Sequence, residues 1–183
     1  MSFKAFIDAA KSIITVGAST NAAARQEIRD VVGKLGDELD RALSITDSYL
    51  VGAKFSVDDK ELSRYLADVD GKLMNSYYEH HICAGLYHLA DKFEQVFDPT
   101  RFSVSISNYN EIPRLVSELK NGEQVVLDDL TDIANKLRDY SQELNSGSIS
   151  REQVLNAVEY HREEVNRYRK KVKSQRRTLL SKL

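Results

Sequence analysis

The sequence has few prolines, glycines and cysteines and no tryptophan among its 183 residues. Its two prolines and eight glycines make up about 5% of the chain, where average usage gives roughly 12%. An all-β protein needs more of these turn residues and a Pro/Gly-rich disordered chain has far more, so both classes are disfavoured. The one cysteine, Cys83, has no partner for an internal disulfide, so we expect a reducing compartment and a cytoplasmic protein.

Long apolar runs and a secretory leader are also missing. The longest apolar stretch without a charged residue, Ser12 to Ala24, is too short to span a membrane as a helix. The first residues include Asp8 and show no basic leader followed by an apolar run, so we expect no secretory signal. With 42% hydrophobic residues, 30% charged residues and a net charge of −2, we expect one domain over residues 1–183 with a sizeable core.

Motifs for known catalytic mechanisms are missing as well. The chain has no phosphate-binding P-loop, no dinucleotide-binding glycine motif, no HExxH zinc motif and no GxSxG nucleophile elbow. It also lacks the Glu-x-x-His pairs of di-iron bundles and the paired cysteines of zinc sites. These absences favour a protein that is not an enzyme, and we expect no catalytic residues, no cofactor and no small-molecule substrate.

What the sequence does contain is helical periodicity, most clearly between Ala22 and Phe55. Apolar residues recur there in alternating steps of four and three, as in a helix of a bundle core. The predicted buried seam is Ile28, Val32, Leu35, Leu39, Ala42, Thr46, Tyr49 and Ala53, with Val31, Leu43 and Leu50 on its flanks. Gly33 and Gly36 are costly inside a helix, and we interpret them as marking a close helix crossing.

The rest of the chain indicates further helices separated by short breaks. They are expected at Phe3–Val16, Asp59–Val96, 113–120, Glu123–Leu144 and Ser150–Leu183, with an extended loop at Thr100–Asn110. Ser56 or Asp58 is expected to cap the helix at 59–96, and Ser150 with Gln153 forms a capping-box pattern at the start of the last helix. Apolar stripes at the two ends of 59–96 do not share one seam, which indicates contacts with more than one neighbour. The seam predicted for 123–144 is Val126, Leu130, Ile133, Leu137, Tyr140 and Leu144, and that of the last helix begins with Val154, Val158, His161 and Val165.

These lengths predict an all-α protein. The expected architecture is an elongated antiparallel four-helix bundle with a short N-terminal accessory helix and a long basic C-terminal helix. Three helices of about 33–38 residues would each be roughly 50–57 Å long. Helices of that length need neighbours to cover their apolar faces, and short connections place successive helices antiparallel.

Charge is distributed unevenly along the chain. Ser148–Leu183 contains ten Lys/Arg and four Glu, a balance of +6, whereas residues 1–147 contain 16 basic and 24 acidic residues, a balance of −8. The candidate partner- or anion-binding residues are the cations clustered on the last helix: Arg162, Arg167, Arg169, Lys170, Lys171, Lys173, Arg176 and Arg177. Three interpretations stay open: a solvated face with some cations paired to acidic neighbours, a site for an anionic lipid surface, or a contact for an acidic protein face. Nucleic acid is disfavoured, because the rest of the chain is acidic and no recognition motif is present.

A second cluster, of His80, His81, Cys83 and His88, lies in the helix expected at 59–96. Imidazole and thiolate groups bind soft metals, and a thiolate beside histidines is reactive. However, His81 and His88 are separated by roughly 10 Å along a helix, too far to share one ion without ligands from another helix. We therefore interpret the cluster as partly buried core residues and expect no metal, with a metal- or thiol-dependent enzyme as the alternative.

The leading functional hypothesis is a non-catalytic interaction protein, which means an adaptor, a scaffold or an assembly subunit. It would bind a protein partner through exposed helical faces, including the basic C-terminal helix. The alternative is a bundle that binds anionic membranes peripherally, through the amphipathic helix at 3–14 and the basic helix together. We also expect a homodimer through the last helix, because its stripe of Tyr168, Val172, Leu179 and Leu180 would be exposed in a monomer unless the helices at 22–55 and 59–96 cover it.

Overall fold

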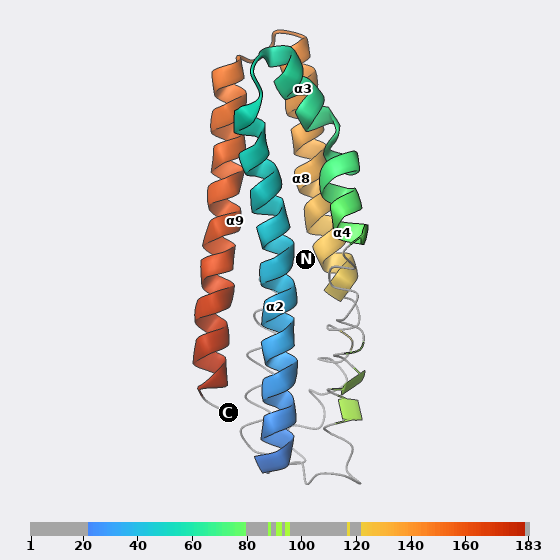
Figure 1. Cartoon of the computed structure of the whole chain (residues 1–183), viewed down its shortest axis with the longest axis vertical. Coiled ribbons are helices and arrows are strands. Elements are labelled where there is room, and N and C mark those ends of the chain that lie inside the picture. The colour runs from blue at the N-terminus through green and yellow to red at the C-terminus, as the bar shows by residue number, and fades with distance from the viewer. Residues whose placement is uncertain are drawn as a thin grey trace. The chain divides into compact units, whose positions relative to one another are not determined.

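The computed structural model of the chain describes residues 22–79, 88, 91–92, 94–95, 117 and 122–181. Every regular element in these ranges is helical, which confirms the all-α prediction. The elements are α2 (Ala22–Gly52), the 3-10 helix η1 (Ala53–Phe55), α3 (Asp59–Ala67), the π-helical turn η2 (Asp70–Met74), α4 (Asn75–Glu79), α8 (Gly122–Asn145) and α9 (Arg151–Leu180) (Figure 1).

Several expectations lie outside the described residues. They are the N-terminal accessory helix at 3–16, the extended loop at 100–110, the helix at 113–120 apart from Ser117, and three members of the second cluster, His80, His81 and Cys83. The fourth member, His88, is helical and exposed.

The chain divides by its contacts into two compact units. Unit one comprises Met1–Asp40, Cys83–Leu127 and Lys171–Leu183, and unit two comprises Arg41–Ile82 and Asp128–Lys170. Helices α2, α8 and α9 each contribute residues to both units.

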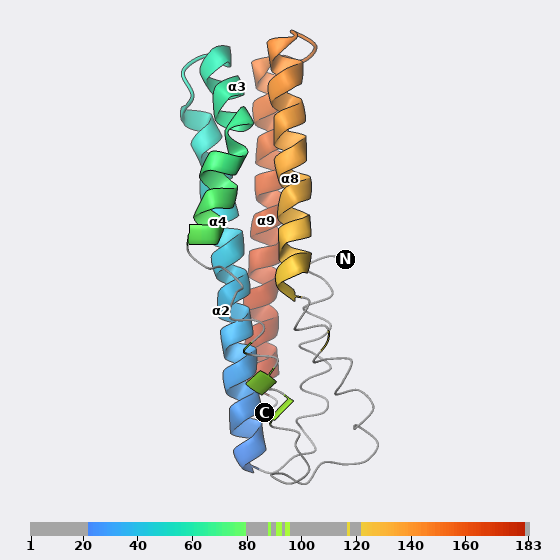
Figure 2. The ribbon, with the colours of Figure 1, turned by 90° about the vertical axis from the view of Figure 1, so that its right-hand side faces the viewer.

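Unit two is a four-helix bundle in which α2, α3 with α4, α8 and α9 each contact two neighbours, and α2 and α8 run opposite to α3 and α9 (Figure 2). The contacts that close this ring are Tyr49–Tyr65 between α2 and α3, Ser63–Ser141 between α3 and α8, Tyr140–His161 between α8 and α9, and Asp47–Arg162 between α2 and α9. Leu62, Leu66, Val69 and Leu73 are fully buried in its core. These contacts join each of the four helices to two others, which fits the four-helix arrangement expected from the sequence.

The predicted seam of α2 is confirmed at every position, since all eleven of its residues are buried. The predicted seam of α8 is confirmed at Leu130, Leu137 and Leu144, which are buried, and Val126 lies outside the residues whose burial is described. Ala134 and Ser141 are buried, whereas Ile133 and Tyr140 lie half-buried beside them. Small residues allow α8 to approach α3 closely, where the Ser63 and Ser141 hydroxyl oxygens are 2.8 Å apart and Ser141 also donates to the Ser63 carbonyl at 2.8 Å.

The predicted caps have the expected chemistry. Asp58, rather than Ser56, caps α3, because its carboxylate accepts from the Glu61 amide at 2.8 Å. The capping box at the start of α9 is confirmed, since Ser150 donates its amide to Gln153 and Gln153 donates its amide to the Ser150 hydroxyl. Gly147 lies in the turn after α8 with a φ of 72°, a conformation that favours glycine.

The described part of the helix expected at 59–96 contains a π-helical turn at Asp70–Met74, and the second of its two apolar stripes lies outside the described residues. A π-turn holds more residues than an α-turn, so the residues that follow are rotated about the helix axis. Arg138 of α8 donates to both carboxylate oxygens of Asp70 at 2.6 Å, which ties this turn to the neighbouring helix.

Two tyrosines join α2 to α3 reciprocally. Tyr49 donates its hydroxyl to the Tyr65 carbonyl and Tyr65 donates to the Tyr49 carbonyl, both at 2.8 Å, with the rings stacked 4.9 Å apart. Burial raises the pKa of both hydroxyls above the ordinary tyrosine value. Gly52 makes room for this pair, because a Cβ there would lie 2.0 Å from the Tyr65 hydroxyl oxygen.

Candidate functional site: the two basic faces of α9

The eight candidate cations of the last helix divide into two sets. Four of them form ion pairs with acids of α2, and we name them the paired basic face: Arg162, Arg169, Lys173 and Arg176. The other four are exposed, and we name them the exposed basic face: Arg167, Lys170, Lys171 and Arg177. Both faces lie on the one helix α9, so helical spacing alone separates them.

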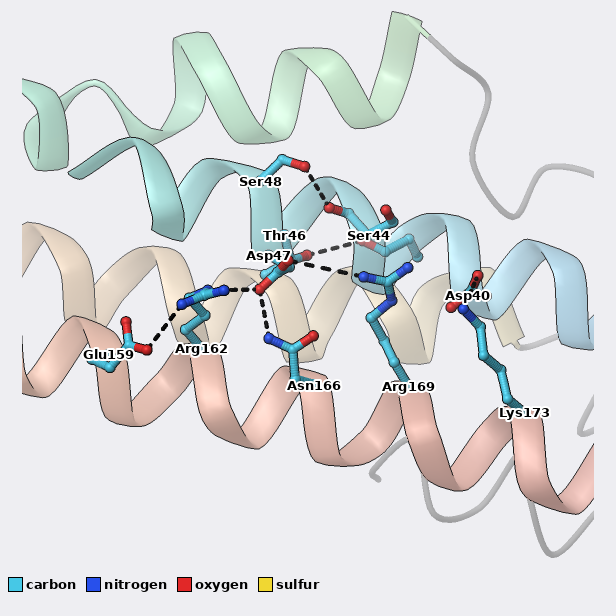
Figure 3. Close-up of polar contacts among 11 residues, drawn as sticks. Asp40, Ser44, Thr46, Asp47, Ser48, Glu159, Arg162, Asn166, Arg169 and Lys173 are labelled. Carbon is cyan, nitrogen blue, oxygen red and sulfur yellow. Dashed lines mark hydrogen bonds and ion pairs between the residues drawn. The ribbon is translucent and has the colours of Figure 1, made fainter. Parts of the chain in front are cut away.

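In unit two, the paired basic face converges on the carboxylate of Asp47 (Figure 3). Its Oδ1 atom accepts from Arg162 Nε at 3.0 Å and from Asn166 Nδ2 at 2.7 Å. Arg169 Nη1 lies 3.9 Å from the Oδ2 atom. The Asp47 side chain is only 18% exposed, so these contacts are partly shielded from water and are stronger than ordinary surface pairs.

A second acid extends this network along α9. Glu159 Oε1 accepts from Arg162 Nη1 at 2.9 Å, and Glu159 Oε2 lies 2.6 Å from Lys54 Nζ in η1. The hydrogen bond from Lys54 lowers the pKa of Glu159, and the charge and hydrogen bond of Arg162 act in the same direction, against a smaller opposing effect of burial. The chain Lys54–Glu159–Arg162–Asp47 therefore alternates in sign and links α9 to η1 at one end and to α2 at the other.

In unit one, the same face makes two further pairs with α2. Lys173 Nζ lies 3.2 Å from Asp40 Oδ2, and Arg176 donates to both carboxylate oxygens of Asp37 at 2.5 and 3.0 Å. Gly36 makes room for the Arg176 side chain, because a Cβ there would lie 2.8 Å from Arg176 Cδ. The close approach predicted from Gly33 and Gly36 is therefore that of an arginine side chain lying across α2.

Among the residues that the structure describes, no acid of a neighbouring helix is paired with the exposed basic face. Arg167, Lys170, Lys171 and Arg177 are all exposed, and within the described part of the chain none of them forms an ion pair. Their spacing of three, four and ten residues from Arg167 places them within roughly a third of the helix circumference. The result is a strip of positive charge that carries no apolar residue.

The acids of α2 were missed by sequence reasoning, although their spacing carries a signal. Asp37 and Asp40 are three residues apart, as are Lys173 and Arg176. Between antiparallel helices, equal spacings of opposite charge bring each acid beside one cation. Arg167 and Lys170 have the same spacing, so the interval identifies the pairing only once the alignment of the two helices is known.

His161 occupies the seam position predicted for it, but it is half-buried. Tyr140 Oη and His161 Nε2 are 3.2 Å apart, and the Tyr160 ring lies edge-on at a centroid distance of 5.7 Å. Burial lowers the pKa of His161 below its ordinary value; the charge of Lys136 acts in the same direction and that of Glu164 opposes it. This arrangement is that of a packed histidine in the α8–α9 interface.

The apolar stripe that predicts a homodimer is partly covered within the chain. Val172 is 4% exposed and Val165 is 5% exposed, and Tyr168 and Leu180 are half-buried. Val172 is therefore covered within the chain, the burial of Leu179 lies outside what the structure describes, and the homodimer stays a prediction.

Comparison of the chain with family models, curated proteins and solved structures found no match. Among the residues that the structure describes, no helix is long and apolar enough to cross a membrane. In the same residues, no group of three or more His, Cys, Asp or Glu side chains is placed to hold a metal ion.

Proposed function

We propose that the protein is a non-catalytic interaction protein, an adaptor, scaffold or assembly subunit, that binds an acidic face of a protein partner. The observation that carries the proposal is the exposed basic face, whose four cations have no ion pair among the described residues. The acids of α2 lie beside the other side of the same helix, where they pair with the paired basic face.

The paired basic face supports this function by fixing the helix. Arg162 and Asn166 both donate to Asp47, which holds α9 against α2 in unit two. A surface on a fixed helix loses little conformational entropy when it binds. Exposed charges contribute mainly to the association rate and to partner choice, so we expect a contact that weakens as salt is added.

The experiment replaces Arg167, Lys170, Lys171 and Arg177 by Gln in one variant, because Gln retains helix propensity. The matched control replaces four other exposed cations on α2 and α3 by Gln: Lys34, Arg41, Lys60 and Arg64. Both variants lose four positive charges. Each is tagged and used to capture partners from extracts of the source cells, followed by binding assays with the purified partner. We expect the basic-face variant to lose the partner and the control to retain it, and equal losses would contradict the proposal.

An anionic surface is the second candidate, since phosphate groups are attracted to the same exposed cations. Vesicles of phosphatidylcholine, with and without phosphatidylserine, test it directly, and duplex DNA and single-stranded RNA are tested alongside. Lipid binding would be worth about 1 kcal/mol per cation near the surface. If the wild-type protein binds acidic vesicles and the basic-face variant does not, the partner of the exposed basic face is a membrane surface and not a protein. Sedimentation velocity in the same series shows whether a second copy of the chain is the partner.

A further inference from the structure

The exposed basic face of α9 has a surface of opposite charge on another helix of the same chain, α8. Asp132, Asp139 and Glu143 are exposed, and none of them forms an ion pair within the part of the chain that the structure describes. Their positions along α8 place them within roughly a sixth of the helix circumference, and Asp128 is exposed on the same side one turn earlier. We name Asp132, Asp139 and Glu143 the exposed acidic face.

Each of these two faces carries charge of nearly one sign. From Val165 to the end of the chain the sequence contains no acid. On α8, Lys136 is the one exposed cation, because Arg138 is half-buried and donates to Asp70. The exposed cations of the neighbouring α3, Lys60 and Arg64, form no ion pair in the described residues. The exposed acidic face is therefore a surface that attracts cations, as the exposed basic face attracts acids.

The spacings of the two faces match when the two helices run antiparallel. The acids are separated by seven and then four residues along α8, and the cations, counted backwards from Arg177, by six or seven and then three or four along α9. Pairs on α9 and α2 already form in this way between antiparallel helices. The alignment places Glu143 beside Arg167, Asp139 beside Lys170 and Lys171, and Asp132 beside Arg177.

The charges that could oppose this alignment fall opposite uncharged residues. Lys136, which lies between the acids, is opposite Ser174. Glu163 and Glu164, which precede the exposed basic face, are opposite residues of the turn 145–148, which carries no charge. The two faces are therefore complementary in their uncharged positions as well as in their charged ones.

We infer that the acidic protein face bound by the exposed basic face is the exposed acidic face of a second copy of this chain. The inference rests on the proposed function and names its partner. The two faces lie on different helices, so the contact is head-to-tail, and one copy has a free face for a further copy. Exposed ion pairs contribute little individually, so the association is reversible, depends on protein concentration and weakens as salt is added.

The experiment reverses the charge of each face in the full-length protein. The variant D132K/D139K/E143K makes the acidic face basic, and the variant R167E/K170E/K171E/R177E makes the basic face acidic. Sedimentation velocity measures self-association at equal protein concentrations, in about 50 and about 200 mM salt. We expect wild type to associate at the lower salt with a dissociation constant at least about 10-fold smaller than at the higher salt. Each reversed variant alone should stay monomeric.

Mixing the two reversed variants separates a specific contact from a general effect of net charge. The basic α8 of one variant then meets the acidic α9 of the other, so we expect the mixture to associate as wild type does. The control D30K/D59K/E152K reverses three other exposed acids, changes the net charge as much as D132K/D139K/E143K and should still associate. Circular dichroism checks that each variant keeps its helices, which we expect because the replaced side chains are exposed.

Loss in both variants and recovery in the mixture would support the inference. A wild-type protein that stays monomeric at low salt, or folded variants that do not associate when mixed, would overturn it. If wild type stays monomeric and its exposed basic face captures a different acidic protein, this inference fails and the proposed function holds. If wild type self-associates and reversal of the basic face does not weaken the association, the exposed basic face is not the contact and the inference fails.

Discussion

The two basic faces of α9 contain the same kinds of residue but have different surroundings. The paired basic face lies opposite Asp37, Asp40 and Asp47 of α2, whereas no described acid pairs with the exposed basic face. Composition alone cannot separate these sets, since each adds the same charge to the same helix. The difference shows that the position of acids on a neighbouring helix decides whether a cation of α9 is paired within the chain.

The largest expected effect is the difference in stability between two variants, each of which lacks one of the two basic faces. Replacing Arg162, Arg169, Lys173 and Arg176 by Gln leaves Asp47 partly buried without its charged donors and deletes two surface pairs. We expect the free energy of unfolding to fall by about 2–4 kcal/mol. The variant without the exposed basic face is expected to change it by less than about 1 kcal/mol. Urea unfolding followed by circular dichroism measures both, and similar losses would show that the two faces do not differ in stability.

A single substitution on α2 tests the contribution of the shared acid to the paired basic face. Asp47→Asn keeps the shape of the side chain and removes the charge that three donors of α9 share. We expect a loss of about 1–3 kcal/mol in the free energy of unfolding. Asp132→Asn, at an exposed aspartate of α8, is the matched control and should have almost no effect. Equal urea midpoints for the two variants would contradict the role of Asp47 in holding the paired basic face.

The two glycines of α2 give a finer contrast. Alanine is a better helix former than glycine by about 1 kcal/mol, so Gly33→Ala should stabilise the protein. Its Cβ would meet Arg176 at an ordinary 3.7 Å, whereas that of Gly36→Ala would lie 2.8 Å from Arg176 Cδ and displace the side chain from Asp37. We therefore expect Gly36→Ala to stabilise the protein less than Gly33→Ala does. Each glycine variant is then combined with Arg176→Ala and followed by thermal unfolding. Without the Arg176 side chain, both glycine changes should raise the stability equally. If they still differ, the contact with Arg176 is not the cause.

The smallest expected effect is a pH dependence at His161, on the core side of α9. Burial lowers the pKa of His161 in the folded protein, so the unfolded chain binds the proton more readily. The contribution of His161 to the free energy of unfolding is therefore fully present above its unfolded pKa of about 6.5, and it is lost as the pH falls below that value through the folded pKa. The pKa of Glu159 is also lowered, and its contribution is lost only at lower pH, as the pH falls through that folded pKa. Unfolding midpoints from about pH 7.5 to pH 5 for wild type and His161→Gln test this, and identical slopes would contradict it.

Much of the helical framework was predictable from the sequence, because periodicity along one helix reports which side is buried. The α2 seam and the Ser150–Gln153 capping box are examples. Contacts between helices were less accessible, since they depend on how two helices are aligned. Ser63 and Ser141 are polar and small, so nothing in their own chemistry indicates that they meet in the core. Which cations of α9 would face the acids of α2 also depends on that alignment.

The measurement that tests the central claim most directly is the salt dependence of partner affinity. The partner captured by the wild-type protein is titrated from about 50 to about 200 mM salt against wild type, the variant without the exposed basic face, and the four-charge control on α2 and α3. If Arg167, Lys170, Lys171 and Arg177 form the contact, affinity for wild type and control falls steeply with salt. The basic-face variant then binds weakly at every salt concentration with a shallower slope. Three parallel slopes with equal affinities would contradict the account.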